Sequence, residues 1–281
     1  ADTLWLTYNL RNTNPDNAYA STALLGLDCG GNTRFSQTVA NIEDTNNHTD
    51  PVLTYHGQRV LLAWQSDTLA LSPQNLDVRF RIYDMFGQSL TSSDQVLETT
   101  VNGVAEGANA WMVAASPAGQ DGFALAGVRG HSGASGFQAF WQQISSSGAL
   151  IGETADLSLE ENVGHTYPTL VRKDENMLMA WEYAENWDNS QIALTRAEVD
   201  DLGDDHDVLV IDMEGDAGLP VVGWGPSGVH AFVAFHVQTT SGTQIYIQKA
   251  DDEAQALRMD SAIGHAHSPA LALGENAGLL V

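Results

Sequence analysis

The stretch HTDPVLTYHGQRVLLAW, residues 48–64, decides the fold, because it returns in altered form as HTYPTLVRKDENMLMAW at residues 165–181. Both copies hold a histidine, a proline, a polar turn and an apolar run that ends in tryptophan. Related apolar runs, LWLTY, FALAG and AFVAF, occupy residues 4–8, 123–127 and 231–235. Neighbouring runs are about 55 residues apart, which is longer than the common helical repeats and suits a repeat of four strands.

Each repeat predicts the same order of strands. A short first strand is followed by a polar turn such as HGQ at 56–58, and then by the apolar second strand. The third strand alternates apolar and polar residues, as in VRFRIY at 78–83, which is the pattern of a half-buried strand. A tight turn such as DMFG at 84–87 leads into the fourth strand. The sequence therefore predicts an all-β chain of repeated four-stranded antiparallel sheets.

These repeats resemble the β-propeller repeats of bacterial secreted and surface proteins. Twisted four-stranded sheets cannot cover both of their faces alone, so blades pack face to face around an axis. We expect one propeller domain over residues 1–281, with five blades closed by strands from both chain ends; a fragment of a longer propeller is the alternative. The expected repeats are 1–47 (completed by 265–281), 48–106, 107–163, 164–215 and 216–264. The aromatic residues expected in the core between blades are Tyr8, Trp64, Trp181 and Phe235.

The composition excludes several classes of protein. With 36 acidic and 11 basic residues the formal net charge is -25, which argues against nucleic-acid binding. No apolar run reaches the roughly 20 residues that a membrane-spanning helix needs. Cys29 is the sole cysteine, so an internal disulfide is impossible. We expect no cofactor. Calcium is the alternative, because acidic runs at 200–207 and 251–253 supply oxygen ligands, but neither run follows the twelve-residue calcium loop and we interpret both as solvated turns.

In a propeller, the connections between blades and the loops after the second strands emerge on one face, where ligands bind. The residues expected on the loops after the second strands are Arg11, Asp67, Arg129, His131, Glu182, Trp187, Asp188 and His236. His48, His165 and His265 each precede a first strand, so converging neutral imidazoles are candidate metal ligands. The alternative is that each histidine caps the start of its strand through a hydrogen bond to a neighbouring blade. The candidates for ligand binding are His48, Asp50, His165, Tyr167, Trp187, Asp188, His265 and His267.

These features lead us to expect a non-enzymatic binding module, extracellular or in the cell envelope, that presents loops to a protein or glycan partner. The alternative is a glycoside hydrolase. The HTDP segment at 48–51 is similar to the Asp-Pro at which five-bladed arabinan-, xylan- or fructan-cleaving enzymes place their general base, which implies that role for Asp50. Such cleavage needs a second carboxyl group about 5 to 9.5 Å away, and no partner is evident. A segment of a larger surface assembly is the third hypothesis.

Overall fold

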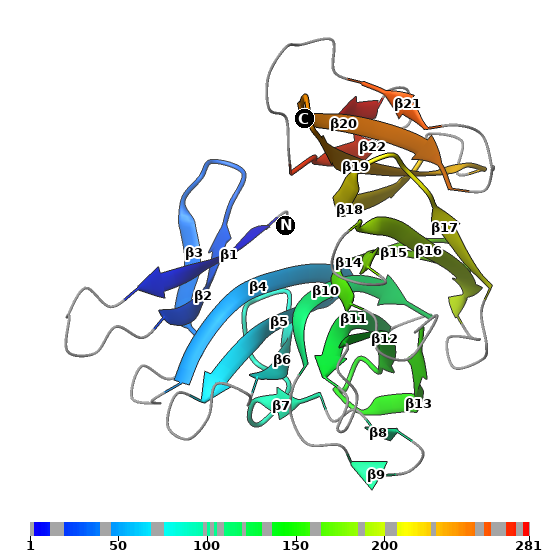
Figure 1. Cartoon of the computed structure of the whole chain (residues 1–281). Coiled ribbons are helices and arrows are strands. Elements are labelled where there is room, and N and C mark those ends of the chain that lie inside the picture. Colours follow the sequence, from blue (N-terminus) through cyan, green and yellow to red (C-terminus); the bar gives the residue numbers. More distant parts are fainter. Residues whose placement is uncertain are drawn as a thin grey trace. The chain divides into compact units, whose positions relative to one another are not determined.

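The computed structural model consists of β-strands joined by turns (Figure 1). In the part of the chain that it describes, no helix is long and apolar enough to cross a membrane. The described residues are 3–11, 20–39, 46–68, 76–97, 100–101, 104–105, 110–119, 122–130, 137–157, 164–184, 189–199, 207–225, 229–250, 256–259, 268–273 and 278–280.

The chain divides into two compact units, and each is described by itself. Unit 1 comprises residues 1–125 and 143–154, and unit 2 comprises residues 126–142 and 155–281. Unit 1 contains the sheets β1-β2-β3 and β4-β5-β6-β7 and the short hairpin β8-β9. The bounds are β1 (Leu4–Arg11), β2 (Ala20–Leu27), β3 (Thr33–Thr38), β4 (Asn46–His56), β5 (Arg59–Thr68), β6 (Leu76–Asp84), β7 (Gln95–Val96), β8 (Thr100–Val101) and β9 (Val104–Ala105).

Unit 2 contains two further four-stranded sheets, β14-β15-β16-β17 and β18-β19-β20-β21, and the hairpin β22-β23. A fourth sheet of this size, β10-β11-β12-β13, contributes residues to both units. The bounds are β10 (Ala110–Ala118), β11 (Gly122–Gly130), β12 (Phe137–Ile144), β13 (Leu150–Asp156), β14 (Gly164–Lys173), β15 (Asn176–Ala184), β16 (Gln191–Glu198), β17 (Val208–Ile211), β18 (Asp216–Trp224), β19 (Ala231–Thr239), β20 (Gly242–Lys249), β21 (Leu257–Arg258), β22 (Leu271–Leu273) and β23 (Gly278–Leu280).

The predicted strand order is confirmed in the four-stranded sheets, because each pairs consecutive antiparallel strands. The apolar runs at 60–64, 177–181 and 231–235 lie on the second strands β5, β15 and β19. The expected closure of the ring by strands from both chain ends is not shown, because β22 pairs with β23 in the described residues. The sheets form a partial propeller, and the number of blades and the closure of the ring stay predictions.

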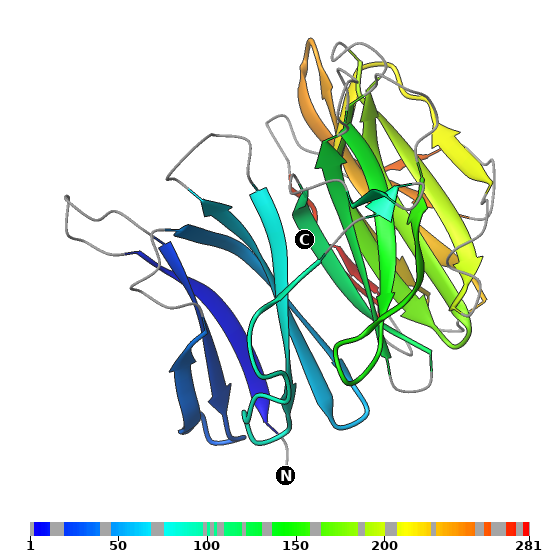
Figure 2. The same cartoon turned by 90° about the horizontal axis from the view of Figure 1, so that it is seen from below.

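Apolar side chains pack between successive sheets within each unit. Figures 1 and 2 show the strands that carry them. In unit 1, Leu24 of β2 packs with Leu62 and Trp64 of β5. In unit 2, Leu194 of β16 belongs to one cluster with Phe235 of β19. Trp64, Trp181 and Phe235 are fully buried, as predicted.

The expectation for the fourth aromatic residue, Tyr8, is wrong, because 39% of its surface is exposed. Tyr8 lies on β1, an edge strand of a sheet that has only three strands in the described residues. Leu4, Leu6 and Leu10 of the same strand are also exposed. One face of β1 therefore lacks the cover that a neighbouring strand or sheet supplies elsewhere.

The tight turns between third and fourth strands share one hydrogen-bonding scheme. In the turn that begins at Asp84, Gly87 donates its N–H to the Asp84 carbonyl, and Asp84 Oδ1 accepts the N–H groups of Phe86 and Gln88. Gly87 has a φ of 83°, a conformation that glycine adopts at no steric cost. Equivalent turns begin at Asp28 and Ser145.

A second repeated feature is a bulge near the start of each leading strand. The register shifts between Thr49 and Val52 in β4, between Thr166 and Thr169 in β14, and between Gly218 and Val221 in β18. One residue at each bulge has a positive φ, which is uncommon for residues other than glycine. The left-handed residues at this repeat position are Asp50 (50°), Met112 (54°), Tyr167 (49°), Leu219 (49°) and Ser268 (58°).

Candidate functional site

The repeated histidine and tryptophan form a pair in each of two sheets. Trp64 donates its indole N–H to Nδ1 of His48 over 3.1 Å, and Trp181 donates to Nδ1 of His165 over 2.8 Å. Both imidazoles are buried, with 1% and 0% of their surfaces exposed. The bond joins neighbouring strands of one sheet, not neighbouring blades, and it accounts for the recurrence of both residue types.

This arrangement keeps His165 neutral. Burial lowers the pKa of His165 to about 4, and the carboxylate of Asp156 opposes that shift only in part. Within the described ranges, no three histidine, cysteine or acidic side chains are grouped so that they could hold a metal ion. His265, the third metal candidate, lies outside the described residues, as do the ligand-binding candidates Trp187, Asp188 and His267.

Asp50 and Tyr167 occupy the left-handed bulge positions of β4 and β14. Asp50 is exposed, and Tyr167 has 45% of its surface exposed. Asp50 belongs to unit 1 and Tyr167 to unit 2. The bulge thus directs two of the predicted site residues into solvent, each within its own unit.

Unit 2 contains a partly buried carboxyl group, Glu182, at the end of β15. It accepts hydrogen bonds from the hydroxyls of Ser190 and Thr166 and from the backbone N–H of Leu219. Burial raises the pKa of Glu182, and these hydrogen bonds offset only part of that effect; the nearby charge of Asp216 raises the pKa further. Glu182 is therefore more easily protonated than an exposed glutamate.

The bulge of β18 leaves room for this carboxyl group because residue 218 is a glycine. A Cβ atom at Gly218 would lie 2.7 Å from Oε2 of Glu182 and 3.3 Å from Nε2 of His236. Any larger residue would displace the carboxyl group or the backbone. Glu182, His236 and the Gly218–Leu219 backbone consequently meet at one place, which we call the Glu182 site.

Unit 1 uses the same arrangement with a neutral side chain. Gln65 directly follows Trp64, as Glu182 directly follows Trp181. Oε1 of Gln65 accepts the backbone N–H of Met112, the left-handed residue of the next leading strand, over 3.4 Å. An acceptor at this repeat position therefore holds the next bulge. A glutamine suffices for that role, so the fold does not need an ionisable group at the position of Glu182.

Sequence reasoning placed Glu182 and His236 on the loop face but did not select them. The available signal was the residue that follows tryptophan in the two copies, glutamine in one and glutamate in the other.

No family model matches this chain, and no curated protein matches it. Among solved structures, it is similar to the Trypanosoma rangeli sialidase, with a TM-score of 0.58 and 10% identity over 96% of this chain and 48% of the sialidase. It is also similar to the α-L-arabinanase of Penicillium chrysogenum, solved with arabinobiose, with a TM-score of 0.54 and 14% identity over 83% of this chain and 74% of the other. A protein assigned as an exo-β-1,3-galactanase from Bifidobacterium bifidum gives a TM-score of 0.54 and 10% identity over 95% and 90% of the two chains.

The chain thus spans about half the length of the sialidase. At these identities the likeness establishes the fold, which is that of the β-propeller glycoside hydrolases. The comparisons contradict the expectation of a non-enzymatic binding module, because these similar structures carry the names of carbohydrate-cleaving enzymes. They favour the alternative that the sequence left open, a glycoside hydrolase.

Proposed function

We propose that this protein hydrolyses glycosidic bonds and that Glu182 is the proton donor. Glycoside hydrolysis requires a carboxylic acid that protonates the leaving-group oxygen, and enzymes prepare such a group by raising its pKa. Among the described carboxyl groups, Glu182 combines partial burial, a raised pKa and a fixed orientation set by three hydrogen bonds. That combination is the observation that carries the proposal.

The chemistry of the Glu182 site fits proton donation. In the protonated form, the carboxyl group carries a proton that can be transferred to the glycosidic oxygen as the bond between that oxygen and the anomeric carbon breaks. The N–H of Leu219 and the hydroxyls of Ser190 and Thr166 fix the orientation of the carboxyl group. After the transfer, the same three donors stabilise the carboxylate that remains.

The reaction also needs a second carboxyl group, as nucleophile or as base. The resemblance of the HTDP segment implies the role of general base for Asp50, which is exposed on the bulge of β4 in unit 1; this prediction rests on the sequence and not on a site shared with Glu182. The substrate class that we propose is a glycan of the kind named for the similar structures: an arabinan, a β-1,3-galactan or a sialoside. An extracellular or envelope location and a five-bladed ring form part of the same proposal.

The experiment compares hydrolysis of arabinan, β-1,3-galactan and sialyllactose by the wild-type protein and by matched variants. We expect Glu182→Gln to lower kcat by about 100-fold or more, because general acid catalysis contributes about 10²–10⁴-fold. Its urea midpoint at pH 7 should not fall, because Gln65 shows that an amide can hold the bulge. Gln65→Glu is the matched control and should leave kcat unchanged.

Asp50→Asn tests the second carboxyl group and should also lower kcat without changing the urea midpoint. Wild-type protein that releases sugar from none of the three substrates would reject the proposal. Full activity in Glu182→Gln would reject the role of Glu182 and reduce this residue to its structural function at the bulge.

A further inference from the structure

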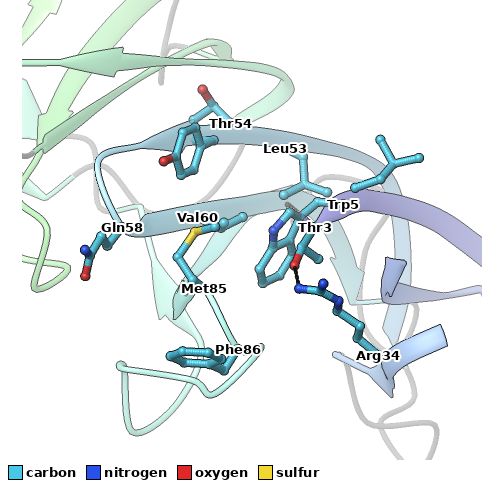
Figure 3. Close-up of a pocket in the computed structure, with 11 residues that line it drawn as sticks. Thr3, Trp5, Arg34, Leu53, Thr54, Gln58, Val60, Met85 and Phe86 are labelled. Atoms are coloured by element: carbon cyan, nitrogen blue, oxygen red, sulfur yellow. Dashed lines mark hydrogen bonds between the residues drawn. The ribbon is translucent and has the colours of Figure 1, made fainter. Parts of the chain in front are cut away.

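Unit 1 contains an open cleft of about 760 Å³ between β1 and the β4–β5 hairpin (Figure 3). Residues from β1, β3, the end of β4 and the turn after β6 line it. Trp5 is held in place by Phe35, with ring centroids 4.7 Å apart. Arg34 donates a hydrogen bond from Nη1 to Oγ1 of Thr3 over 2.7 Å, which fixes a second wall. The volume falls in the range of small-molecule sites.

The rim of this cleft carries two exposed aromatic rings. Phe86 has 85% of its surface exposed, and Tyr55 has 54% exposed. The backbone beside Phe86 is nevertheless fixed, because Asp84 Oδ1 accepts the N–H groups of Phe86 and Gln88. Gln37 of β3 also donates its side-chain N–H to the Gly87 carbonyl over 3.0 Å. The turn therefore presents a phenyl ring to solvent from a well-anchored backbone.

Comparison with the equivalent turns shows that the fold does not require this ring. The position of Phe86 is occupied by Gly30 in the turn that begins at Asp28 and by Ser147 in the turn that begins at Ser145. The turn at Asp28 forms the same hydrogen bonds with a glycine there, and in the turn at Ser145 the hydroxyl of Ser145 still accepts the N–H of Ala149. Phe86 and Tyr55 are both exposed and line the same cleft, and exposed apolar groups that gather at a groove mark binding sites.

We propose that this cleft binds a neutral oligosaccharide. The faces of sugar rings carry C–H groups and stack on aromatic side chains, whereas their edges carry hydroxyls that need polar partners. Tyr55 and Phe86 supply exposed rings, and Thr3, Arg34 and Gln58 supply polar groups in the same cleft. A strongly anionic ligand fits poorly, because the chain carries a net charge of -25 and Arg34 is the single arginine among the described residues that line the cleft.

The cleft is separate from the bulge that carries Asp50. Asp50 is the fifth of the eleven residues of β4, whereas Tyr55 is the tenth and lies beside the turn into β5. Binding in the cleft should therefore be independent of hydrolysis. Such a site would hold a polymer on the protein without taking part in its cleavage.

Affinity electrophoresis in gels containing soluble arabinan, arabinoxylan or β-1,3-galactan tests the proposal. We expect at least one polymer to retard the wild-type protein. Phe86→Ala and Tyr55→Ala should each weaken this retardation at least about ten-fold in apparent Kd, because aromatic residues dominate the energetics of binding sites. Val229→Ala is the control: its side chain is 61% exposed but does not line the cleft, and it should bind like the wild type.

Hydrolysis by Phe86→Ala should stay at the wild-type level, and binding by Glu182→Gln should stay intact, so that the two proposals fail independently. Absence of retardation by all three polymers would overturn the inference, as would equal retardation of wild type and Phe86→Ala. Sedimentation of the same proteins provides the last check. A wild-type dimer that Phe86→Ala converts into a monomer would show that the ring contacts a second copy of the chain instead.

Discussion

At the scale of single residues, the His165–Trp181 pair links stability to pH. The imidazole is fully buried and its pKa is about 4, whereas an unfolded histidine has a pKa near 6.5. Between these two values the unfolded chain binds the proton and the folded chain does not, so the free energy of unfolding falls as the pH falls. The window for this loss is pH 6.5 down to 4, and its full size is about 3 kcal/mol.

We predict that His165→Asn removes much of this pH dependence. The amide oxygen of asparagine can take the place of Nδ1 and accept the indole N–H of Trp181, and it does not titrate. Urea denaturation at pH 7 and pH 4.5 measures the difference for both proteins. Glu182 changes stability in the opposite direction, because its raised pKa makes the folded state lose stability as the pH rises above 4.5. Glu182 is present in both proteins, so its effect cancels when their free energies of unfolding are compared. An equal change in the free energy of unfolding between pH 7 and pH 4.5 in the two proteins would contradict the prediction.

The sequence predicts part of the histidine–tryptophan pairing. The histidine and the tryptophan are 16 residues apart in both copies, which marks a shared structural position. Their mutual hydrogen bond could not be predicted, because it depends on the register between β4 and β5 and between β14 and β15. A histidine at a strand start fits a metal ligand and a buried acceptor equally well until the neighbouring strand is known.

At the scale of elements, the bulge of β18 determines whether the Glu182 site can form. We predict that Gly218→Ala destabilises the protein by about 1–3 kcal/mol, the usual cost of forcing extra atoms into packed space. The added Cβ would lie 2.7 Å from Oε2 of Glu182, so the carboxyl group must move. Urea denaturation measures the loss, and hydrolysis should fall with it.

A double-mutant cycle identifies the cause of that loss. In the Glu182→Ala background, the carboxyl group that meets the new Cβ is absent, so Gly218→Ala should cost less than it does in the wild type. Equal costs in the two backgrounds would place the strain in the backbone and not in the contact with Glu182.

The strands could be predicted from the sequence, whereas the bulges could not. Alternation and turn residues indicate where strands such as β6 and β20 lie, because side-chain burial repeats every second residue. Four of the five left-handed residues at the repeat position of the bulges precede a proline, at positions 51, 168, 220 and 269. A residue before proline normally favours an extended conformation with negative φ. The local signal therefore pointed away from the left-handed conformation that Asp50 and Tyr167 adopt, and tertiary packing overrides it.

At the scale of the whole molecule, repetition predicted the packing of sheet against sheet, and the buried Trp64 and Phe235 confirm it. Closure could not be predicted with the same force. Closure of the ring depends on pairing between strands at the two chain ends, and the repeat pattern does not predict the register of that pairing. The expectation of a non-enzymatic module was also wrong, and the similar structures favour the glycoside hydrolase that was the alternative. The raised pKa of Glu182 depends on its burial, which the sequence does not show.

Net charge is the remaining property of the molecule as a whole. The 36 acidic residues outnumber the 11 basic ones, and the described ion pairs engage three arginines, Arg79, Arg81 and Arg129. Repulsion among the remaining carboxylates opposes folding, and salt screens it over a Debye length that shrinks from about 30 Å at 0.01 M to about 3 Å at 1 M. We predict that the urea midpoint at pH 7 rises steadily from about 20 mM to about 500 mM NaCl.

The same measurement separates screening from a specific calcium site. If screening alone acts, NaCl and KCl give the same curve, and CaCl2 adds nothing beyond its ionic strength. A calcium site would instead produce a saturable rise at millimolar CaCl2 that a chelator removes, because a ligand that binds only the folded state stabilises it by mass action. The acidic runs at 200–207 and 251–253 would be its first candidates, and most of their residues lie outside the described ranges. A midpoint that does not change with NaCl would contradict the view that self-repulsion limits the stability of this chain.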